Sequence, residues 1–155
     1  MKKLILVLLF IPLFSFGQIF DYNDLKDINS EKQFKRFSFE NEFVKVEEYE
    51  SYMTYAQNWD KEKGVASIWS YYYPKTGLFE FQIVKNTDGS SADSFNRVLE
   101  QVKAKCAFYD IKEDGYGEFE KEFICYSCPG SSFPGKIGFA RGDKSDYIET
   151  FISFE

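Results

Sequence analysis

The three cysteines are the side chains with the most reactive chemistry in this chain. Cys125 and Cys128 form a Cys-x-x-Cys pair that ends a strand-like segment and runs into Pro129 and Gly130. A thioredoxin-type redox pair instead begins a helix, whose N-terminus lowers the pKa of the first thiol. The chain has no histidine, so a four-ligand Cys/His zinc site is not completed, and Pro129 stands where haem attachment needs histidine. We therefore expect no metal and no cofactor, with a redox role only as an alternative.

In an oxidising compartment the same residues predict one structural disulfide and one remaining thiol. Cys106 ends the apolar face of a predicted helix, and Cys125 shares a strand face with Phe119 and Phe123. We expect Cys106 and Cys125 to meet beneath that helix. A Cys106–Cys128 bond stays open, because the turn of the hairpin that leads to Cys125 does not fix its register, and so do a Cys125–Cys128 bond and no bond at all. An unstrained bridge of this loop length stabilises a protein by roughly 3 kcal/mol.

Two rows of carboxylates are the other groups that could take part in a reaction. They are Glu47, Glu48 and Glu50, and Glu118, Glu120 and Glu122. A glycosidase needs two carboxylates about 5–9 Å apart across the scissile bond, with the pKa of one raised by burial. Neither row has apolar surroundings of that kind, so we interpret both as solvated acidic surfaces. Without histidine, no Ser-His-Asp or Cys-His system can form.

A predicted hairpin carries the sharpest hypothesis for binding. Its strands, 65–73 and 78–85, are joined by Pro74-Lys75-Thr76-Gly77, a loop whose composition suits a tight turn. Side chains alternate between the two faces of a strand, so Phe79, Phe81 and Ile83 share one face, and we expect that face to line the core. The loop length then places Tyr72 opposite Phe79 and Ile68 opposite Ile83.

The same register directs three aromatic side chains away from the core. Trp69, Tyr71 and Tyr73 lie next to Gln82, Glu80 and Leu78, respectively. Trp and Tyr combine a flat apolar surface with a hydrogen-bonding edge, and they concentrate binding energy at interfaces. We therefore predict that Trp69, Tyr71, Tyr73 and Glu80 contact a protein or a glycan. The alternative is that a helix or another strand covers the row, or that these residues simply suit a half-exposed pleated sheet.

The elements around this hairpin predict an α+β fold. One helix begins at a Ser30–Gln33 capping box and ends near Glu40. A second follows Ser91, Asp93 and Ser94, all candidate N-caps, and its apolar face consists of Phe95, Val98, Leu99, Val102 and Cys106. Further strands are expected at 43–46, 52–55, 108–111, 118–127, 136–141 and 147–154. We expect two helices packed on one face of a curved antiparallel β-sheet, in a single domain of residues 18–155. The element order also allows a duplicated unit, 30–85 matching 94–154.

The first residues predict export. Lys2 and Lys3 precede an apolar run that is too short to span a bilayer, and small residues at Ser15 and Gly17 mark a cleavage site, so residues 1–17 have the order of a secretory signal peptide. Loss of this leader reduces the basic residues from 19 to 17 against 25 acidic ones, a net charge of −8. Such a charge disfavours nucleic acid and anionic lipid as partners. No stable membrane insertion is expected after cleavage.

The chain also resembles a type of small exported bacterial protein with no known activity. The resemblance rests on the leader ending Phe16-Gly17-Gln18, on Lys105-Cys106, on Cys125-Tyr126-Ser127-Cys128 and on Gly135-Lys136-Ile137-Gly138-Phe139. It implies a periplasmic or extracellular location and nothing about chemistry. The sequence thus predicts a small exported binding module. The alternatives are a carboxylate- or thiol-dependent envelope enzyme and a structural envelope protein.

Overall fold

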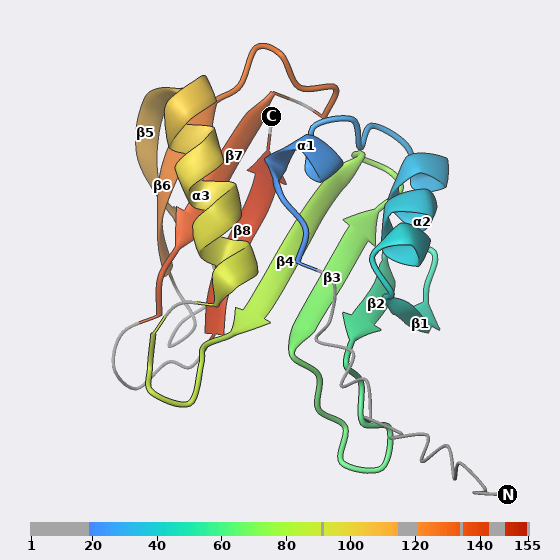
Figure 1. Ribbon diagram of the computed structural model, residues 1–155. Helices are drawn as coiled ribbons and strands as arrows, with labels where there is room; N and C mark the ends of the chain where they lie inside the picture. The colour runs from blue at the N-terminus through green and yellow to red at the C-terminus, as the bar shows by residue number, and fades with distance from the viewer. Residues whose placement is uncertain (1–18, 91, 115–120, 134, 143–147, 155) are drawn as a thin grey trace, which may run out of the picture.

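The computed structural model describes residues 19–90, 92–114, 121–133, 135–142 and 148–154 (Figure 1). Its central feature is one antiparallel sheet of eight strands, in the order β1-β2-β3-β4-β8-β7-β6-β5. The strands are β1 (Val44–Glu48), β2 (Met53–Gln57), β3 (Ile68–Tyr73), β4 (Leu78–Val84), β5 (Ala107–Asp114), β6 (Lys121–Ser127), β7 (Lys136–Ala140) and β8 (Ile148–Phe154). The three described helices are α1 (Tyr22–Leu25), α2 (Glu31–Glu40) and α3 (Asp93–Lys105). The fold is therefore mostly antiparallel sheet with few helices.

The sheet consists of two meanders that meet at its centre. Helix α2 precedes the meander β1–β4, and α3 precedes the meander β5–β8. The last strands of the two meanders, β4 and β8, pair with each other, and Phe81 lies directly opposite Phe151. Their rings stack with centroids 4.9 Å apart, so the junction between the halves is an aromatic contact inside the core.

The main core forms where helix side chains meet one set of sheet residues. Phe34 and Phe37 of α2 contact Phe81, with ring centroids 6.5 and 5.5 Å away. Phe95 of α3 contacts Phe151 at 6.5 Å, in the same cross-strand row as Phe81. We call the sheet face that carries these residues the inner face and the opposite one the outer face. Figure 1 shows α3 lying across β7 and β8 on the viewer's side of the sheet.

Helix α2 begins as its sequence predicts. Ser30 is the N-cap, and its hydroxyl accepts a hydrogen bond from the Gln33 N–H at 3.4 Å. The side chain of Gln33 reaches back and accepts from the Asn29 N–H at 3.0 Å. The Ser30 bond satisfies a donor that the first turn of the helix leaves without a partner, whereas Gln33 bonds to the N–H before the cap and not to that of Ser30 as the predicted capping box would. The predicted capping residues therefore do form the start of this helix.

The start of α3 differs from the prediction. Its N-cap is Ala92, which has no side chain able to accept a hydrogen bond, while Asp93 is already the first helical residue. Ser94 lies inside the helix, and Ser91 is outside the described residues. The apolar face is as predicted, since Phe95 and Val102 are fully buried. Burial of that face, rather than a cap, positions the helix, as tertiary packing does for most protein helices.

Segment 21–28 contains a short helix, α1, that is not among the predicted elements. Asp21 caps α1, because its carboxylate accepts from the Asn23 N–H at 2.7 Å while the Asp24 carboxylate accepts from the Asp21 N–H at 2.8 Å. Asp21 followed three residues later by Asp24 is a capping box built with aspartates. Leu25 and the following Ile28 are buried in the main core.

Every predicted strand has a counterpart in the sheet, with ends that differ by a few residues. Glu118 and Glu120, placed at the start of one predicted strand, and the predicted leader lie outside the described residues. Within the described part of the chain, no helix has the length and apolar character needed to cross a membrane.

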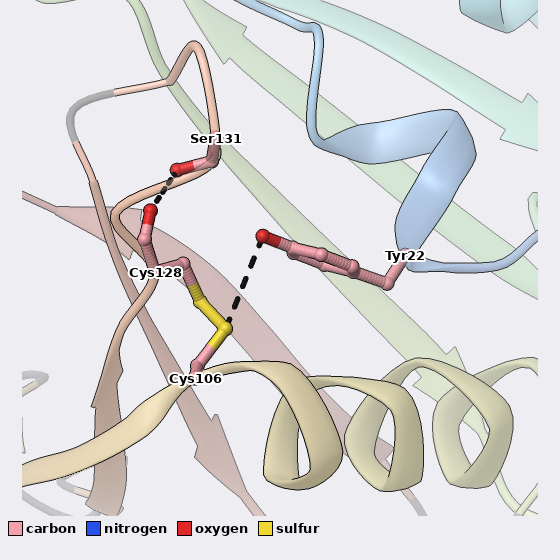
Figure 2. Close-up of a disulfide and its surroundings, with 4 residues drawn as sticks. All are labelled: Tyr22, Cys106, Cys128 and Ser131. Atoms are coloured by element: carbon pink, nitrogen blue, oxygen red, sulfur yellow. Dashed lines mark hydrogen bonds between the residues drawn. A yellow bond between two sulfur atoms is a disulfide. The ribbon is translucent and has the colours of Figure 1, made fainter.

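The predicted Cys106–Cys125 bond is wrong, because the disulfide joins Cys106 to Cys128 (Figure 2). Cys125 lies opposite Gly138 of β7, on the outer face, whereas Cys106 ends α3 on the inner side. Cys125 does share a face with Phe123, as predicted, but that face is not the one beneath the helix. Cys128 lies just beyond the end of β6, where the turn brings its side chain into the main core.

Tyr22 and Ser131 complete the surroundings of the disulfide in Figure 2. The Tyr22 hydroxyl lies 3.9 Å from Cys106 Sγ, and the Ser131 hydroxyl donates to the carbonyl of Cys128 at 2.7 Å. Segment 21–26 is attached to the same region, since the Tyr22 N–H donates to the Gln101 side chain at 3.0 Å. The bond therefore closes the junction between the end of α3, the end of β6 and α1.

Candidate binding surface

The hairpin β3–β4 has the register that its loop predicts. Tyr72 lies opposite Phe79 and Ile68 opposite Ile83, and all four are buried on the inner face. The alternate residues Trp69, Tyr71 and Tyr73 therefore point to the outer face, where each is half-buried. Their cross-strand neighbours on β4 are Gln82, Glu80 and Leu78. The four-residue loop fixed this register, because Gly77 adopts the positive φ that the turn requires.

The connection between β1 and β2 adds two tyrosines that were not among the predicted site residues. Tyr52 lies beside Tyr71 and Tyr73, with ring centroids 6.5 and 6.4 Å apart, and Tyr49 contacts Tyr52 at 5.0 Å. We call Tyr49, Tyr52, Tyr71 and Tyr73 the tyrosine cluster. The register of β2 with β3 depends on the long connection between Gln57 and Ile68, because no short turn in the sequence fixes it. The alternation of side chains within 52–56 predicts which of these residues share a face, but not whether that face is the inner or the outer one.

Small residues on β2 let the cluster lie close to the sheet. Ala56 lies opposite Trp69 and Thr54 opposite Tyr71, and both are buried. The Thr54 hydroxyl has no hydrogen-bond partner among the described residues, although its oxygen is inaccessible to solvent. An unpaired buried hydroxyl costs free energy. The close packing of the cluster on the sheet therefore leaves one polar atom of β2 without compensation.

Glu80 is the charged residue at the centre of this surface. One of its carboxylate oxygens accepts from the Tyr73 hydroxyl at 3.2 Å, and the other accepts from the Gln82 side chain at 2.7 Å. Both bonds hold the carboxylate against β4 in a fixed orientation. The predicted residues Trp69, Tyr71, Tyr73 and Glu80 therefore lie on one continuous surface, although their role in binding is a prediction.

The electrostatic setting of the cluster is negative. Burial, and next to it the Glu80 carboxylate, raise the pKa of both Tyr71 and Tyr73 above the ordinary tyrosine value. The Glu47 carboxylate is the largest cause of the raised pKa of Tyr49. These phenols therefore stay neutral at physiological pH, and the carboxylates beside them favour cations. The surface combines aromatic rings with negative charge.

The other half of the outer face is built differently. Phe123, Cys125 and Ala140 form a second small buried cluster there, against which Ile152 and Phe154 pack. Gly138 lies over this cluster, and a Cβ at its position would be 3.2 Å from Cys125 Sγ and from Phe123 Cβ. The β5–β8 half thus has little space above its strands, and its packing depends on a residue without a side chain.

Lysine side chains extend over the aromatic rings of that half. Lys112 Nζ lies 4.5 Å from the centroid of the Phe154 ring, and Lys136 Nζ lies 4.6 Å from that of Tyr109. Their aliphatic stems cover apolar surface while their charged ends stay in water. Lysines of the chain itself therefore already lie over the rings of Phe154 and Tyr109, although Tyr109 remains 48% exposed.

The carboxylate rows do not form a paired acidic site among the described residues. Glu48 is bonded to Lys45, which lowers the pKa of the Glu48 carboxyl, and Glu50 lies 3.3 Å from Lys75 Nζ. Glu122 is exposed at β6, and the rest of its row lies outside the described residues. In the described residues, no group of three or more Cys, Asp or Glu side chains is placed to hold a metal ion.

The remaining thiol is not placed for nucleophilic chemistry. Cys125 is buried, and burial raises the pKa of its thiol, so the protonated form is favoured. Cys106 and Cys128 are consumed by the disulfide. Among the described residues, a thiol-dependent enzyme mechanism therefore has no accessible thiolate to use.

A small polar pocket of about 110 Å³ lies between α1 and α2, away from the tyrosine cluster. It is lined by Asn23, Asp24, Asp27, Ile28, Gln33, Arg36, Phe37, Glu40 and Asn41. Cofactor and substrate pockets have volumes of about 300–1,000 Å³, so this pocket is too small for such a ligand.

Comparisons of the chain with protein-family models, with curated proteins and with solved structures found no match.

Proposed function

We propose that the protein is a small exported binding module and that its partner docks on the tyrosine cluster together with Trp69 and Glu80. The observation that supports this most directly is the alternation of side chains along β3. It directs Trp69, Tyr71 and Tyr73 to the outer face, where they are half-exposed beside the hydrogen-bonded Glu80 carboxylate. In the β5–β8 half, by contrast, ammonium groups of the chain itself already lie over the rings of Phe154 and Tyr109. Half-exposed Trp and Tyr side chains are typical centres of binding energy.

A polypeptide with basic side chains fits this surface better than a glycan. A sugar ring stacks on a flat aromatic platform, whereas the rings of the cluster are tilted by 44–57° relative to one another. Tilted phenols next to Glu80 and Glu47 present ring faces and negative charge to an ammonium or guanidinium group, which binds over such faces. A glycan remains the second candidate, favoured by the hydrogen-bonding edges of the same side chains.

The test uses the fluorescence of Trp69 in a Trp59→Phe background, titrated with an arginine tetrapeptide and with neutral oligosaccharides. The peptide should bind, and Tyr71→Ala/Tyr73→Ala should weaken binding at least tenfold, because two cation–π contacts of about 0.5–2 kcal/mol each are lost. Tyr109→Ala is the matched control, since it removes an aromatic ring from the other half of the same face.

Equal binding by the double variant and the parent would overturn the assignment of the site. Binding of the oligosaccharides alone would replace the polypeptide with a glycan. Collapse of the thermal unfolding midpoint in Tyr71→Ala/Tyr73→Ala would show that the rings belong to the core and not to a contact surface.

We also propose that the protein acts in the periplasm or outside the cell. The leader-like residues 1–17 and a disulfide of the kind that persists in oxidising compartments support this location. Recovery of a mature chain that begins at Gln18 would agree with export, and recovery of the intact leader in the cytoplasm would contradict it.

We further infer that α2 and α3 cover one face of a curved sheet and that the two helix-plus-meander halves derive from one duplicated unit. Both halves have the order helix, then four strands, and their last strands pair at the centre. This architecture would leave the outer face of the β1–β4 half available for a partner. An enzyme or a structural envelope protein remains the alternative reading, and no feature of the described site favours either.

A further inference from the structure

Strand β5 is an edge of the sheet and carries exposed apolar side chains. Among the described strands it pairs with β6 alone, and it is eight residues long. Phe108 is 61% exposed and Ile111 52%, and Ile124 of the neighbouring strand is 44% exposed. Long apolar edge strands present unpaired backbone groups that another strand can bind. Charges and the register shift at Phe108–Asp110 limit such pairing to partners whose charges are complementary to those of β5.

The backbone at the middle of β5 shows where that partner would bind. The Ile111 N–H donates to the carboxylate of Asp110 at 2.8 Å, as expected for a donor that points away from β6. The register with β6 shifts between Phe108 and Asp110 and is regular from Asp110 to Asp114. Pairing along the regular stretch would therefore exchange the bond between the Ile111 N–H and the Asp110 carboxylate for a backbone bond to the partner strand.

We propose that two copies of this chain associate through antiparallel pairing of their β5 strands, with the two-fold axis at Ile111. A two-fold axis perpendicular to the sheet keeps each face on its own side, so a residue lies opposite a residue of the same face. In this register Ile111 meets Ile111 of the second copy on the inner face. Asp110 meets the second copy's Lys112 on the outer face, and the reverse pair forms by symmetry, as an isologous interface requires.

The charges of β5 select this register over its neighbours. An axis at Asp110 would place two Asp110 carboxylates opposite each other. An axis at Lys112 would oppose two Lys112 ammonium groups and would also pair Asp110 with Asp114. Like charges directly opposite each other on paired strands are destabilising, whereas opposite charges are favourable. The alternation Asp110-Ile111-Lys112 is therefore complementary to itself in one alignment only.

The other edge of the sheet lacks this complementarity. In β1, Lys45 and Glu47 are also two residues apart, but the register shift between them places Lys45 opposite Tyr55 and Glu47 opposite Thr54. The two charges therefore lie on different faces and cannot pair across a two-fold axis. Lys45 is in addition bonded to Glu48 of its own strand. Pairing through β5 is thus specific to one edge, and it is independent of the function proposed for the tyrosine cluster.

Sedimentation velocity of the purified protein over a range of concentrations tests the proposal. The wild type should show a concentration-dependent dimer. Asp110→Lys and Lys112→Asp should each weaken it at least tenfold, because each places like charges opposite each other. The double variant Asp110→Lys/Lys112→Asp restores opposite charges and should restore the dimer. Loss of dimer in the double variant, or a wild type that is monomeric throughout, would overturn the proposal.

The double variant also distinguishes a loss of strand pairing between the two copies from a loss of monomer stability. Each single change removes a contact within the monomer, the Asp110 bond to the Ile111 N–H or the Lys112 contact with Phe154, and the double change removes both. A recovered dimer therefore cannot result from a more stable monomer. Lys45→Glu, at the other edge, is the matched control and should leave the association unchanged.

A covalent readout tests the position of the axis. Ile111→Cys in a Cys125→Ala background should form an intermolecular disulfide on mild oxidation, because two residues on the axis face each other across the pair. Tyr109→Cys and Glu113→Cys lie away from the axis and should cross-link to their own counterparts far more slowly. Equal cross-linking at the three positions would contradict this register.

Discussion

The outer face of the sheet differs between the two halves of the molecule, although the halves have the same order of elements. Over β1–β4 it carries tilted phenols around Glu80, and the rings remain half-exposed. Over β5–β8 it carries a buried cluster around Cys125, with lysine stems extended over the aromatic rings. The inner faces show no such contrast, because phenylalanines from both halves join one core.

This difference indicates that the two halves serve different purposes on a shared scaffold. The β5–β8 half also contains the only disulfide, which joins α3 to the end of β6, since all three cysteines of the chain lie within it. The cysteines and aromatic side chains of this half therefore serve to stabilise the structure. The β1–β4 half has no such covalent bond and keeps aromatic surface available, which is the arrangement expected of a scaffold and the site that it presents.

The largest effect should come from removing the covalent bond. Cys106→Ala/Cys128→Ala should lower the free energy of unfolding by about 3 kcal/mol, because the bond closes a loop between residues 22 apart and restricts the unfolded chain. Chemical denaturation with urea measures this loss. Hydrogen exchange should show the greatest increase at α3, β5 and β6, with a smaller change at β2 and β3.

Reduction provides the control for that prediction. A thiol reductant should destabilise the wild type by a similar amount and leave Cys106→Ala/Cys128→Ala unaffected. If exchange increased equally in β2 and β3, the stabilising role of the bond would extend over the whole sheet, and the proposed division between the halves would fail.

The disulfide also shows where sequence reasoning reached its limit. Strand β6 has apolar side chains on both faces, Phe123 and Cys125 on one and Ile124 and Tyr126 on the other. Alternation therefore could not identify which face lies beneath α3, and the predicted Cys125 pairing followed from the wrong choice. A strand with one polar face would have decided the question.

The candidate site was predictable to the extent that local turns fix register. A four-residue loop joins β3 to β4, so Trp69, Tyr71, Tyr73 and Glu80 could be placed on one face from sequence alone. Tyr52 reaches that face through a long connection, and no local rule fixes the pairing across it. The eight strands were predictable from their composition, whereas the pairing of β4 with β8 depends on packing between distant segments.

A smaller effect is expected from one methyl group in the tight half of the outer face. Gly138→Ala would place a Cβ 3.2 Å from Cys125 Sγ and from Phe123 Cβ. Overpacking of this kind costs about 1–3 kcal/mol, which thermal unfolding can measure. Adding Cys125→Ala removes one of the two contacts and should recover part of the loss.

Gly130→Ala is the matched control for that change. No atom lies within 4 Å of a Cβ at Gly130, so its stability should stay close to that of the wild type. A Gly138→Ala protein as stable as the wild type would show that the β5–β8 half has space above its strands, which would remove the contrast with the tyrosine cluster.

The smallest effect concerns the phenols of the open half, and it depends on pH. The pKa of Tyr73 is raised by burial first and by Glu80 second, so the folded protein holds this proton more tightly than the unfolded chain does. The unfolded chain loses its phenol protons first, near pH 10, and stability should therefore fall as the pH rises through and above that value. Tyr73→Phe should make this fall shallower, measured as the urea midpoint at pH 9 and pH 11.

Glu80→Gln separates the two causes of the shift. Without the carboxylate, the pKa of Tyr73 should move back toward the ordinary tyrosine value while its burial is kept. The difference in absorbance at 295 nm between this protein and the same protein with Tyr73→Phe would report the ionisation of that one phenol among the eleven tyrosines. If Glu80→Gln left the titration of Tyr73 unchanged, the carboxylate would not influence the ring beside it. The negative character assigned to the tyrosine cluster would then have to come from Glu47 alone, and a preference for cationic partners would rest on the half of the cluster near Tyr49.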